Sequence, residues 1–121
     1  MLFDLMGTIA CLSLIMYMEA LNQGDYTKAL VADVAIERAK QEELSVCQSM
    51  KRKKSYSWMW DGKNTKVDNQ ILKDLRQIAV SELKKPTITG RYFFNECRSA
   101  SKGRRYKTEY KLIKSEKLCF Y

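Results

Sequence analysis

The sequence contains no histidine among its 121 residues. Ser-His-Asp and Cys-His hydrolases therefore lack their imidazole base here, and a catalytic zinc ion lacks its usual nitrogen ligands. No GxxxxGK[ST] or GxGxxG motif is present, so nothing indicates nucleotide binding. Carboxylate chemistry, metal-dependent phosphoryl transfer and the absence of catalysis remain open. We expect no metal site and no cofactor.

Residues that break regular structure are scarce, with one proline and five glycines. No internal repeat and no Gly/Ser- or Pro-rich linker interrupts the chain. Hydrophobic residues make up 45% of the sequence, which is enough for one compact core. We therefore expect a single domain over residues 1–121.

An almost entirely apolar run extends from Leu5 to Met18. An export signal would need a basic start and a small-residue cleavage site, yet the first positively charged side chain is Lys28. The run is also shorter than the roughly 20 apolar residues of a membrane span. We expect a buried core helix from Gly7 to about Leu21, without stable membrane insertion.

The four cysteines, Cys11, Cys47, Cys97 and Cys119, show no CxxC or other metal-like spacing. A cysteine in an apolar helix is commonly a buried free thiol, so we expect reduced, structural cysteines. An even number also permits disulfides in an oxidising compartment.

Hydrophobic spacing predicts two further helices. Asp25 is the expected N-cap of a helix that runs to about Lys40. Its apolar face comprises Leu30, Val31, Val34 and Ala35, and the polar residues expected on the other side are Asp33, Glu37 and Lys40. Between Asp68 and Lys84 an amphipathic helix is expected, with a stripe formed by Ile71, Leu72, Leu75, Ile78, Ala79 and Leu83.

The rest of the chain has weaker signals. Residues 41–66 indicate an irregular loop or short strand. Beyond Pro86, β-branched and aromatic residues favour short extended segments at 87–94 and 106–121. The predicted fold class is mainly α (α+β), with about three main helices and a minor β or irregular C-terminal part.

Glu19 is the carboxylate that stands out, because it ends the apolar helix instead of lying in a charged patch. Burial against apolar neighbours raises the pKa of a carboxyl group, as a general acid near neutral pH requires. The alternative is a glutamate that only marks where the helix meets water.

Several short motifs resemble the SleB-type cell wall hydrolases and follow the same order along almost the whole chain. They are Tyr17-Met18-Glu19-Ala20, Val31-Ala32-Asp33-Val34, Ile36-Glu37-Arg38-Ala39, Val46-Cys47, Tyr56-Ser57-Trp58, Tyr92-Phe93-Phe94-Asn95 and Phe120-Tyr121. The departures are Leu21-Asn22-Gln23 in place of Arg-Gly-Glu, Glu37 in place of Asn, Ser55 in place of Gln, and Phe94 and Leu118 at two histidine positions.

The resemblance implies a lysozyme-like fold and cleavage of the bond between N-acetylmuramic acid and N-acetylglucosamine. Glu19 would be the catalytic acid and base, as a lytic transglycosylase if the sugar's 6-hydroxyl attacks or as a muramidase if water attacks. The family's nearby second glutamate is Gln23 here, which favours the transglycosylase route. As second carboxylates for a muramidase, the candidates are Asp25, Asp33, Glu37 and Asp61.

The resemblance also suggests that Ser57, Tyr92 and Asn95 line the substrate cleft. Trp58 and Trp60 offer flat faces to sugar rings, or else pack in the core as most tryptophans do. Arg38 is either a cleft residue or an internal hydrogen-bond anchor.

The formal charge of +8 indicates an anionic partner or a solvated basic face. Its main sources are Lys51–Lys54, Lys84-Lys85 and the run from Arg98 to Lys117. The basic run before Tyr56, Trp58 and Trp60 also fits a nucleic-acid-binding module. A third hypothesis is an inactive relative with a structural or peptidoglycan-binding role.

The expected partner is the peptidoglycan glycan strand, with other virion proteins as further partners and no nucleic acid. A short chain with no export signal and no wall-binding repeat is typical of a bacteriophage lysin or virion-associated lysin. Such a protein is expected in the virion or the host cytoplasm, and it acts at the bacterial cell wall.

Overall fold

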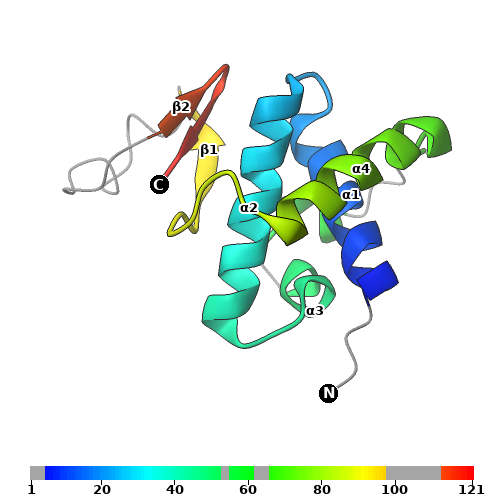
Figure 1. Ribbon diagram of the computed structural model, residues 1–121, viewed down its shortest axis with the longest axis horizontal. Helices are drawn as coiled ribbons and strands as arrows, with labels where there is room; N and C mark the ends of the chain where they lie inside the picture. The colour runs from blue at the N-terminus through cyan, green and yellow to red at the C-terminus, as the bar shows by residue number, and fades with distance from the viewer. Residues whose placement is uncertain (1–4, 53–54, 62–65, 98–112) are drawn as a thin grey trace.

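The structure, a computed structural model, describes residues 5–52, 55–61, 66–97 and 113–121. Within these ranges the helices are α1 (Leu5–Ala20), α2 (Asp25–Glu42), α3 (Val46–Lys51) and α4 (Asn69–Lys84), with a 3₁₀ turn, η1 (Ser57–Met59), and the strands are β1 (Phe94–Glu96), β2 (Ile113–Ser115) and β3 (Leu118–Phe120). The expected fold class, mainly α with a minor β part, is confirmed. Figure 1 shows the small sheet on one side of the helices.

The buried core is built around α1 and α2. Leu12, Ile15 and Met16 of α1 are fully buried, as are Leu30 and Val31 of α2. The same cluster takes in residues of α3, α4 and β3. The prediction of a buried apolar N-terminal helix is confirmed, and no helix in the described part of the chain is long and apolar enough to cross a membrane.

The first turn of α2 is capped from a distance and not by its own side chains. Gly24, one residue before the expected Asp25, is the N-cap and makes no side-chain cap. Its N–H donates to both carboxylate oxygens of Glu116, at 2.9 and 3.1 Å, in the turn between β2 and β3. Thr27 Oγ1 also donates to Glu116, at 2.9 Å. A carboxylate suits this position, because the helix dipole favours negative charge at an N-terminus.

Asp33 is buried, contrary to the expected exposed side of α2. It is 1% exposed, and its Oδ2 accepts hydrogen bonds from Thr87 N at 2.9 Å and Ile88 N at 3.0 Å. Glu82 of α4, also buried, accepts from Thr87 N and Oγ1. These carboxylates satisfy the backbone of the chain as it leaves α4, which explains their burial. Residues 87–93 form no strand, so the extended segment predicted there is shorter than expected.

A helix, α3, occupies part of the region expected to be loop or strand. Ser45 and Gln48 form a reciprocal capping box at its start, with Gln48 N donating to Ser45 Oγ at 3.1 Å and Ser45 N donating to Gln48 Oε1 at 3.0 Å. Two satisfied N-terminal donors suffice to start even a short helix that packs on the core. The prediction for residues 41–66 was therefore wrong over Val46–Lys51.

The amphipathic helix predicted between Asp68 and Lys84 is confirmed as α4. Asp68 is its N-cap and accepts from Gln70 N and Ile71 N. The Asp68 N–H in turn donates to Tyr17 Oη at 3.2 Å, which ties the start of α4 to the last turn of α1. Leu75 and Ala79 are buried, and the other members of the stripe pack partly buried against the core.

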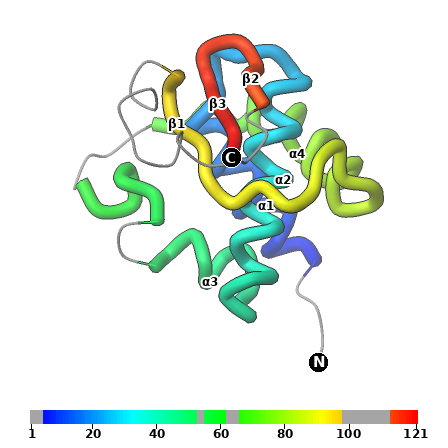
Figure 2. Tube along the Cα trace, turned by 90° about the vertical axis from the view of Figure 1, so that its left-hand side faces the viewer, coloured from blue at the N-terminus to red at the C-terminus, as the bar shows by residue number. Residues whose placement is uncertain are grey.

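The three strands form one antiparallel sheet in the order β1-β3-β2. β1 pairs with β3 with Phe94 opposite Phe120 and Asn95 opposite Cys119. Figure 2 shows the chain after α4 crossing the helices to reach β1 beside β3. The pairing continues past β1, because Tyr92 N and Phe93 N donate to Tyr121 O and Tyr121 N donates to Phe93 O.

All four cysteines form disulfides, so the expectation of reduced thiols was wrong. Cys11 bonds to Cys47 and links α1 to α3, and Cys97 bonds to Cys119 and links the end of β1 to β3. The partners lie 36 and 22 residues apart, so only the fold brings them together. A sequence without local cysteine pairs carries no signal for this connectivity.

Candidate active site

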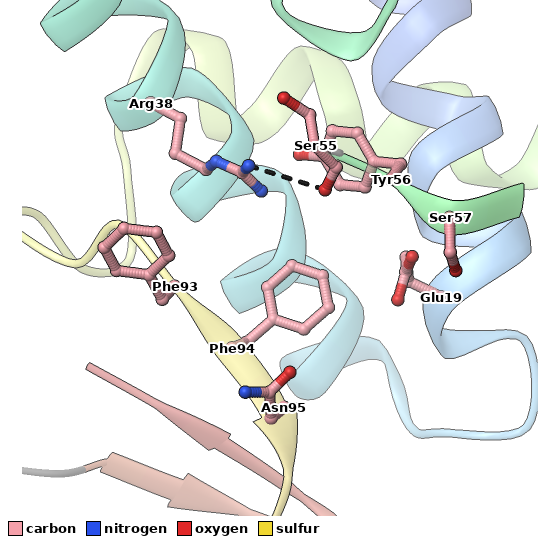
Figure 3. Close-up of a pocket in the computed structure, with 8 residues that line it drawn as sticks. All are labelled: Glu19, Arg38, Ser55, Tyr56, Ser57, Phe93, Phe94 and Asn95. Atoms are coloured by element: carbon pink, nitrogen blue, oxygen red, sulfur yellow. Dashed lines mark hydrogen bonds between the residues drawn. The ribbon is translucent and has the colours of Figure 1, made fainter. Parts of the chain in front are cut away.

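A pocket of about 340 Å³ opens where the last turn of α1 meets α2, the segment around η1 and strand β1. Its lining residues are Glu19, Arg38, Ser55, Tyr56, Ser57, Phe93, Phe94 and Asn95. Figure 3 shows Glu19 at one side of the view, Phe93 at the opposite side and Phe94 between them. The pocket therefore joins residues far apart in sequence around one carboxylate.

Glu19 is held in a partly buried position. Trp58 Nε1 donates to Glu19 Oε1 at 2.8 Å, and no basic nitrogen of the described residues lies within the 4.0 Å of an ion pair with it. Burial raises the pKa of Glu19 above its ordinary value, while the Trp58 hydrogen bond and the positive charge of Arg38 oppose that rise. A carboxyl group that keeps its proton at higher pH suits a general acid.

The Trp58 bond also makes the two oxygens of Glu19 unequal as sites for the proton. An indole N–H can only donate, so Oε1 must act as an acceptor in both protonation states of Glu19. Because a carbonyl oxygen accepts a hydrogen bond better than a carboxyl hydroxyl oxygen does, the proton of the acid form is favoured on Oε2. One oxygen is anchored and the other is left for exchange of a proton with a substrate.

Arg38 of α2 crosses the pocket between aromatic rings. Its guanidinium carbon lies 4.9 Å from the centroid of the Tyr56 ring and 5.8 Å from that of Phe93. Its Nη2 donates to the Ser55 carbonyl oxygen at 3.4 Å. Both roles considered for Arg38 thus apply, because it anchors the Ser55-Tyr56 backbone and also lines the pocket.

Tyr56 lines the pocket next to Arg38 and is 3% exposed. Its ring lies 5.7 Å from that of Trp58. Burial raises the pKa of Tyr56 to about 12, with opposing effects from Arg38 and a further rise from Glu19. Its hydroxyl therefore stays neutral over the working range of an enzyme.

Of the four cleft residues predicted from the sequence, two line the pocket and two lie beside it. Ser57 and Asn95 line the pocket with Glu19, and Asn95 Nδ2 donates to Tyr121 Oη at 2.8 Å. Trp58 contacts Glu19 through its ring nitrogen and packs partly buried against the core, so it positions the carboxylate. Tyr92 is not among the pocket's lining residues, although its backbone pairs with Tyr121 beside the pocket.

Residues that sequence reasoning did not assign to the cleft also line it. Ser55, Phe93 and Phe94 do so, and Tyr56 and Phe93 flank Arg38. All lie in or next to the short motifs that carry the family resemblance. Their positions could be found from the motifs, but not which side chain would face the pocket.

The candidate second carboxylates do not line the pocket that holds Glu19. Asp25, Asp33, Glu37 and Asp61 are all absent from the pocket lining, and within the described residues Glu19 is the only carboxylate that lines it. Asp33 instead pairs with the backbone at Thr87 and Ile88. Asp25 lies at the start of α2 with its side chain 87% exposed.

The aromatic and basic residues of the nucleic-acid hypothesis lie around the same segment. Trp60 is 55% exposed, and its Nε1 donates to Arg52 O at 3.4 Å. Arg52 forms an ion pair with Glu42. Lys53 and Lys54, and residues 98–112 of the C-terminal basic run, lie outside the described residues.

Comparisons with known protein families, with curated proteins and with solved structures find no match to this chain.

Proposed function

We propose that this protein cleaves the glycan strands of peptidoglycan between N-acetylmuramic acid and N-acetylglucosamine, with Glu19 as acid and base. The observation that carries the proposal is the setting of Glu19, which lines a pocket, has a raised pKa and is anchored by Trp58 through one oxygen. The proposal rests on this geometry together with the ordered resemblance to the SleB-type cell wall hydrolases.

The reaction would proceed in two proton transfers. Protonated Glu19 gives its Oε2 proton to the glycosidic oxygen as the C1–O bond of the muramoyl residue breaks toward an oxocarbenium-like state. The 6-hydroxyl of the same residue then attacks C1 and returns its proton to the Glu19 carboxylate. The products are a 1,6-anhydromuramoyl end and a new N-acetylglucosamine end, and the enzyme regains its starting state.

A transglycosylase fits this pocket better than a muramidase. Glycosidases with two carboxylates place the second group about 5 to 9.5 Å from the first, either as nucleophile or to activate water. Glu19 is the only carboxylate lining the pocket within the described residues. An internal hydroxyl nucleophile needs no second carboxylate, so the arrangement favours the anhydro product.

The biological setting that we propose is that of a phage lysin or a virion-associated lysin acting at the cell wall. The two disulfides support work outside a reducing cytoplasm, where such bonds persist. The net charge of +8 would favour approach to an anionic envelope.

The test is digestion of purified sacculi by the wild-type protein and by Glu19→Gln, followed by mass spectrometry of the soluble products. We expect the wild type to release fragments with 1,6-anhydro ends and Glu19→Gln to be slower by about a hundredfold or more, the usual contribution of a general acid. Glu37→Gln serves as the matched control, because Glu37 is absent from the pocket lining.

Equal release by wild type and Glu19→Gln would remove Glu19 from the mechanism. Reducing ends in place of anhydro ends would indicate a muramidase. Binding to sacculi without release by the wild type would identify an inactive relative with a peptidoglycan-binding role.

A further inference from the structure

Arg38 has more hydrogen-bonding capacity than the protein uses. A guanidinium group carries five N–H donors, and within the described residues it donates to two acceptors, the Ser55 carbonyl oxygen at 3.4 Å and the Tyr56 hydroxyl. No carboxylate of the described residues lies within the 4.0 Å of an ion pair with it. The positive charge of Arg38 thus makes no direct ion pair within the described residues, although it acts on Glu19 across the pocket.

The group is also held in a fixed plane. The Tyr56 and Phe93 rings lie within 6 Å of its central carbon, the range of cation–π contacts, and the Ser55 carbonyl fixes one edge. Figure 3 shows the guanidinium pointing from α2 into the pocket, toward Ser55 and Tyr56. A planar guanidinium that is fixed in this way is suited to bidentate pairing with a carboxylate, which a flexible lysine would recognise only as a point charge.

We propose that Arg38 is a specificity-determining residue that binds a carboxylate of the substrate next to the bond that is cleaved. Arg38 and Glu19 line one pocket, so a single muramoyl residue can contact both. This inference rests on the proposed function and names the substrate class of the same site, a glycan that carries a free carboxylate.

Two carboxylates in peptidoglycan have this chemistry. One is the lactyl carboxyl group of muramic acid, which is free only where the stem peptide has been removed. The other belongs to the stem peptide itself. If the lactyl group is the ligand, a hydrolysis that cleaves the amide bond between muramic acid and peptide must supply the substrate.

Binding of a carboxylate at Arg38 would also act on Glu19. The positive charge of Arg38 lowers the pKa of Glu19, so a substrate anion that neutralises this charge favours the protonated acid. Among the described residues, the ionisable groups that share the pocket with Glu19 are Arg38 of α2 and Tyr56 before η1, and β1 contributes none. An anionic substrate would thereby promote protonation of the acid that cleaves it.

The experiment measures binding of soluble glycan fragments to the Glu19→Gln protein, which keeps them intact. The ligands are peptide-free muramoyl strands, the same strands with the lactyl carboxyl groups converted to amides, peptide-bearing strands, and chitin oligosaccharides without carboxylates. We expect one carboxylate-bearing class to bind about ten- to a hundredfold more tightly than its uncharged counterpart, as a charge-assisted pair provides.

The matched variant is Arg38→Gln in the Glu19→Gln background, with Arg38→Lys as the partial replacement. Arg38→Gln is expected to remove the difference in affinity between carboxylate-bearing and uncharged strands, and Arg38→Lys to retain part of it. If Arg38→Gln fails to fold, the amidated strands still test whether a carboxylate is recognised, because they are measured on the Glu19→Gln protein with Arg38 in place. Loss of binding on amidation assigns the lactyl group, and an Arg38-dependent preference for peptide-bearing strands alone assigns the stem peptide.

Equal affinity of all four ligands would overturn the role of Arg38, whatever the wild type does to sacculi. Conversely, a carboxylate preference in a protein that cleaves no sacculi would retain the binding site and reject the proposed reaction. If the wild type is active, pH profiles give a further test. The basic limb of kcat reports the pKa of Glu19 with substrate bound, and that of kcat/KM reports the pKa in the free enzyme. With the carboxylate substrate, the limb of kcat should lie at higher pH.

Discussion

Trp58 and Glu19, which are 39 residues apart, meet through one hydrogen bond of 2.8 Å from the indole Nε1 to the carboxylate Oε1. This bond opposes the effect of burial on the pKa of Glu19. It therefore has two consequences for the proposed reaction, since it fixes the carboxylate in place and limits how far its pKa rises.

Trp58→Phe separates these two consequences. Without the N–H donor the pKa of Glu19 should rise further. Because the proposed reaction needs protonated Glu19, the basic limb of kcat/KM should then move to higher pH. The rate on the acidic plateau should fall about tenfold or more, since the carboxyl group is no longer held in position. A pH profile of muropeptide release measures both effects.

Trp60→Phe is the control for that profile, because Trp60 is exposed and its ring nitrogen donates to the backbone at Arg52, away from Glu19. A Trp58→Phe profile that coincides with the wild-type profile would show that the hydrogen bond has no part in catalysis.

Asp33→Asn tests the buried carboxylate pair between α2 and α4. Burial and the neighbouring Glu82 raise the pKa of Asp33 to about 7, against the opposing Ile88 and Thr87 hydrogen bonds. The folded state therefore binds an extra proton between about pH 4 and 7, and wild-type stability should fall as pH rises through that window and then level off.

The neutral asparagine keeps an acceptor for the backbone and has no proton to lose. Asp33→Asn should remove most of the slope and be more stable than the wild type at pH 8, by on the order of 1–3 kcal/mol. Urea unfolding at several pH values measures this, and parallel stability curves for the two proteins would contradict it.

Glu116→Gln tests the remote cap of α2. The variant keeps an acceptor but loses the charge that faces Gly24 N and Thr27 Oγ1. We expect a loss of about 1 kcal/mol in thermal or urea unfolding, the size of a helix cap or dipole contact. The neighbouring Lys117→Gln should leave stability unchanged, and a similar loss in both variants would argue against the cap.

Phe93, Phe94 and Asn95, here called the β wall, line the pocket from β1 and the residue before it. The double variant Cys97→Ala/Cys119→Ala tests how the disulfide supports this β wall. Loss of this loop constraint should cost about 3 kcal/mol of stability. Because β1 and the residue before it supply Phe93, Phe94 and Asn95, muropeptide release should fall even well below the melting temperature.

Cys11→Ala/Cys47→Ala should lose similar stability with less effect on activity, since neither cysteine adjoins the β wall. Release by Cys97→Ala/Cys119→Ala that matches the wild type at low temperature would show that strand pairing alone holds the pocket.

Local signals in the sequence were sufficient for α1, α2 and α4, but not for α3 or for the contacts between the helices. The stripe on α4 and its Asp68 cap are set by residues within one turn of each other. The Ser45 and Gln48 capping box was equally readable, and α3 was missed because the surrounding residues lack clear periodicity. Asp33 was placed on the exposed side because its partners, Thr87 and Ile88, lie more than fifty residues away.

The candidate site shows the same division. Glu19 stood out because its position at the end of an apolar helix is visible in the sequence. No local pattern encodes the long-range contacts of the site. These are the hydrogen bond from Trp58, the rings around Arg38 and the Cys97–Cys119 disulfide. The motifs located the neighbourhood, and the fold determined which atoms meet.

The pairing of β1 with β3 has a consequence for the order in which the molecule assembles. Contacts among α1, α2 and α3 join segments close in sequence, whereas Phe94 pairs with Phe120 and Gly24 with Glu116 across long loops. Contacts between distant residues form late in folding, because the entropy of closing the loop must be overcome first. We therefore expect a helical intermediate in which Glu19 already lies at the end of α1. In this intermediate, Phe94 and Asn95 of β1 do not yet line the pocket.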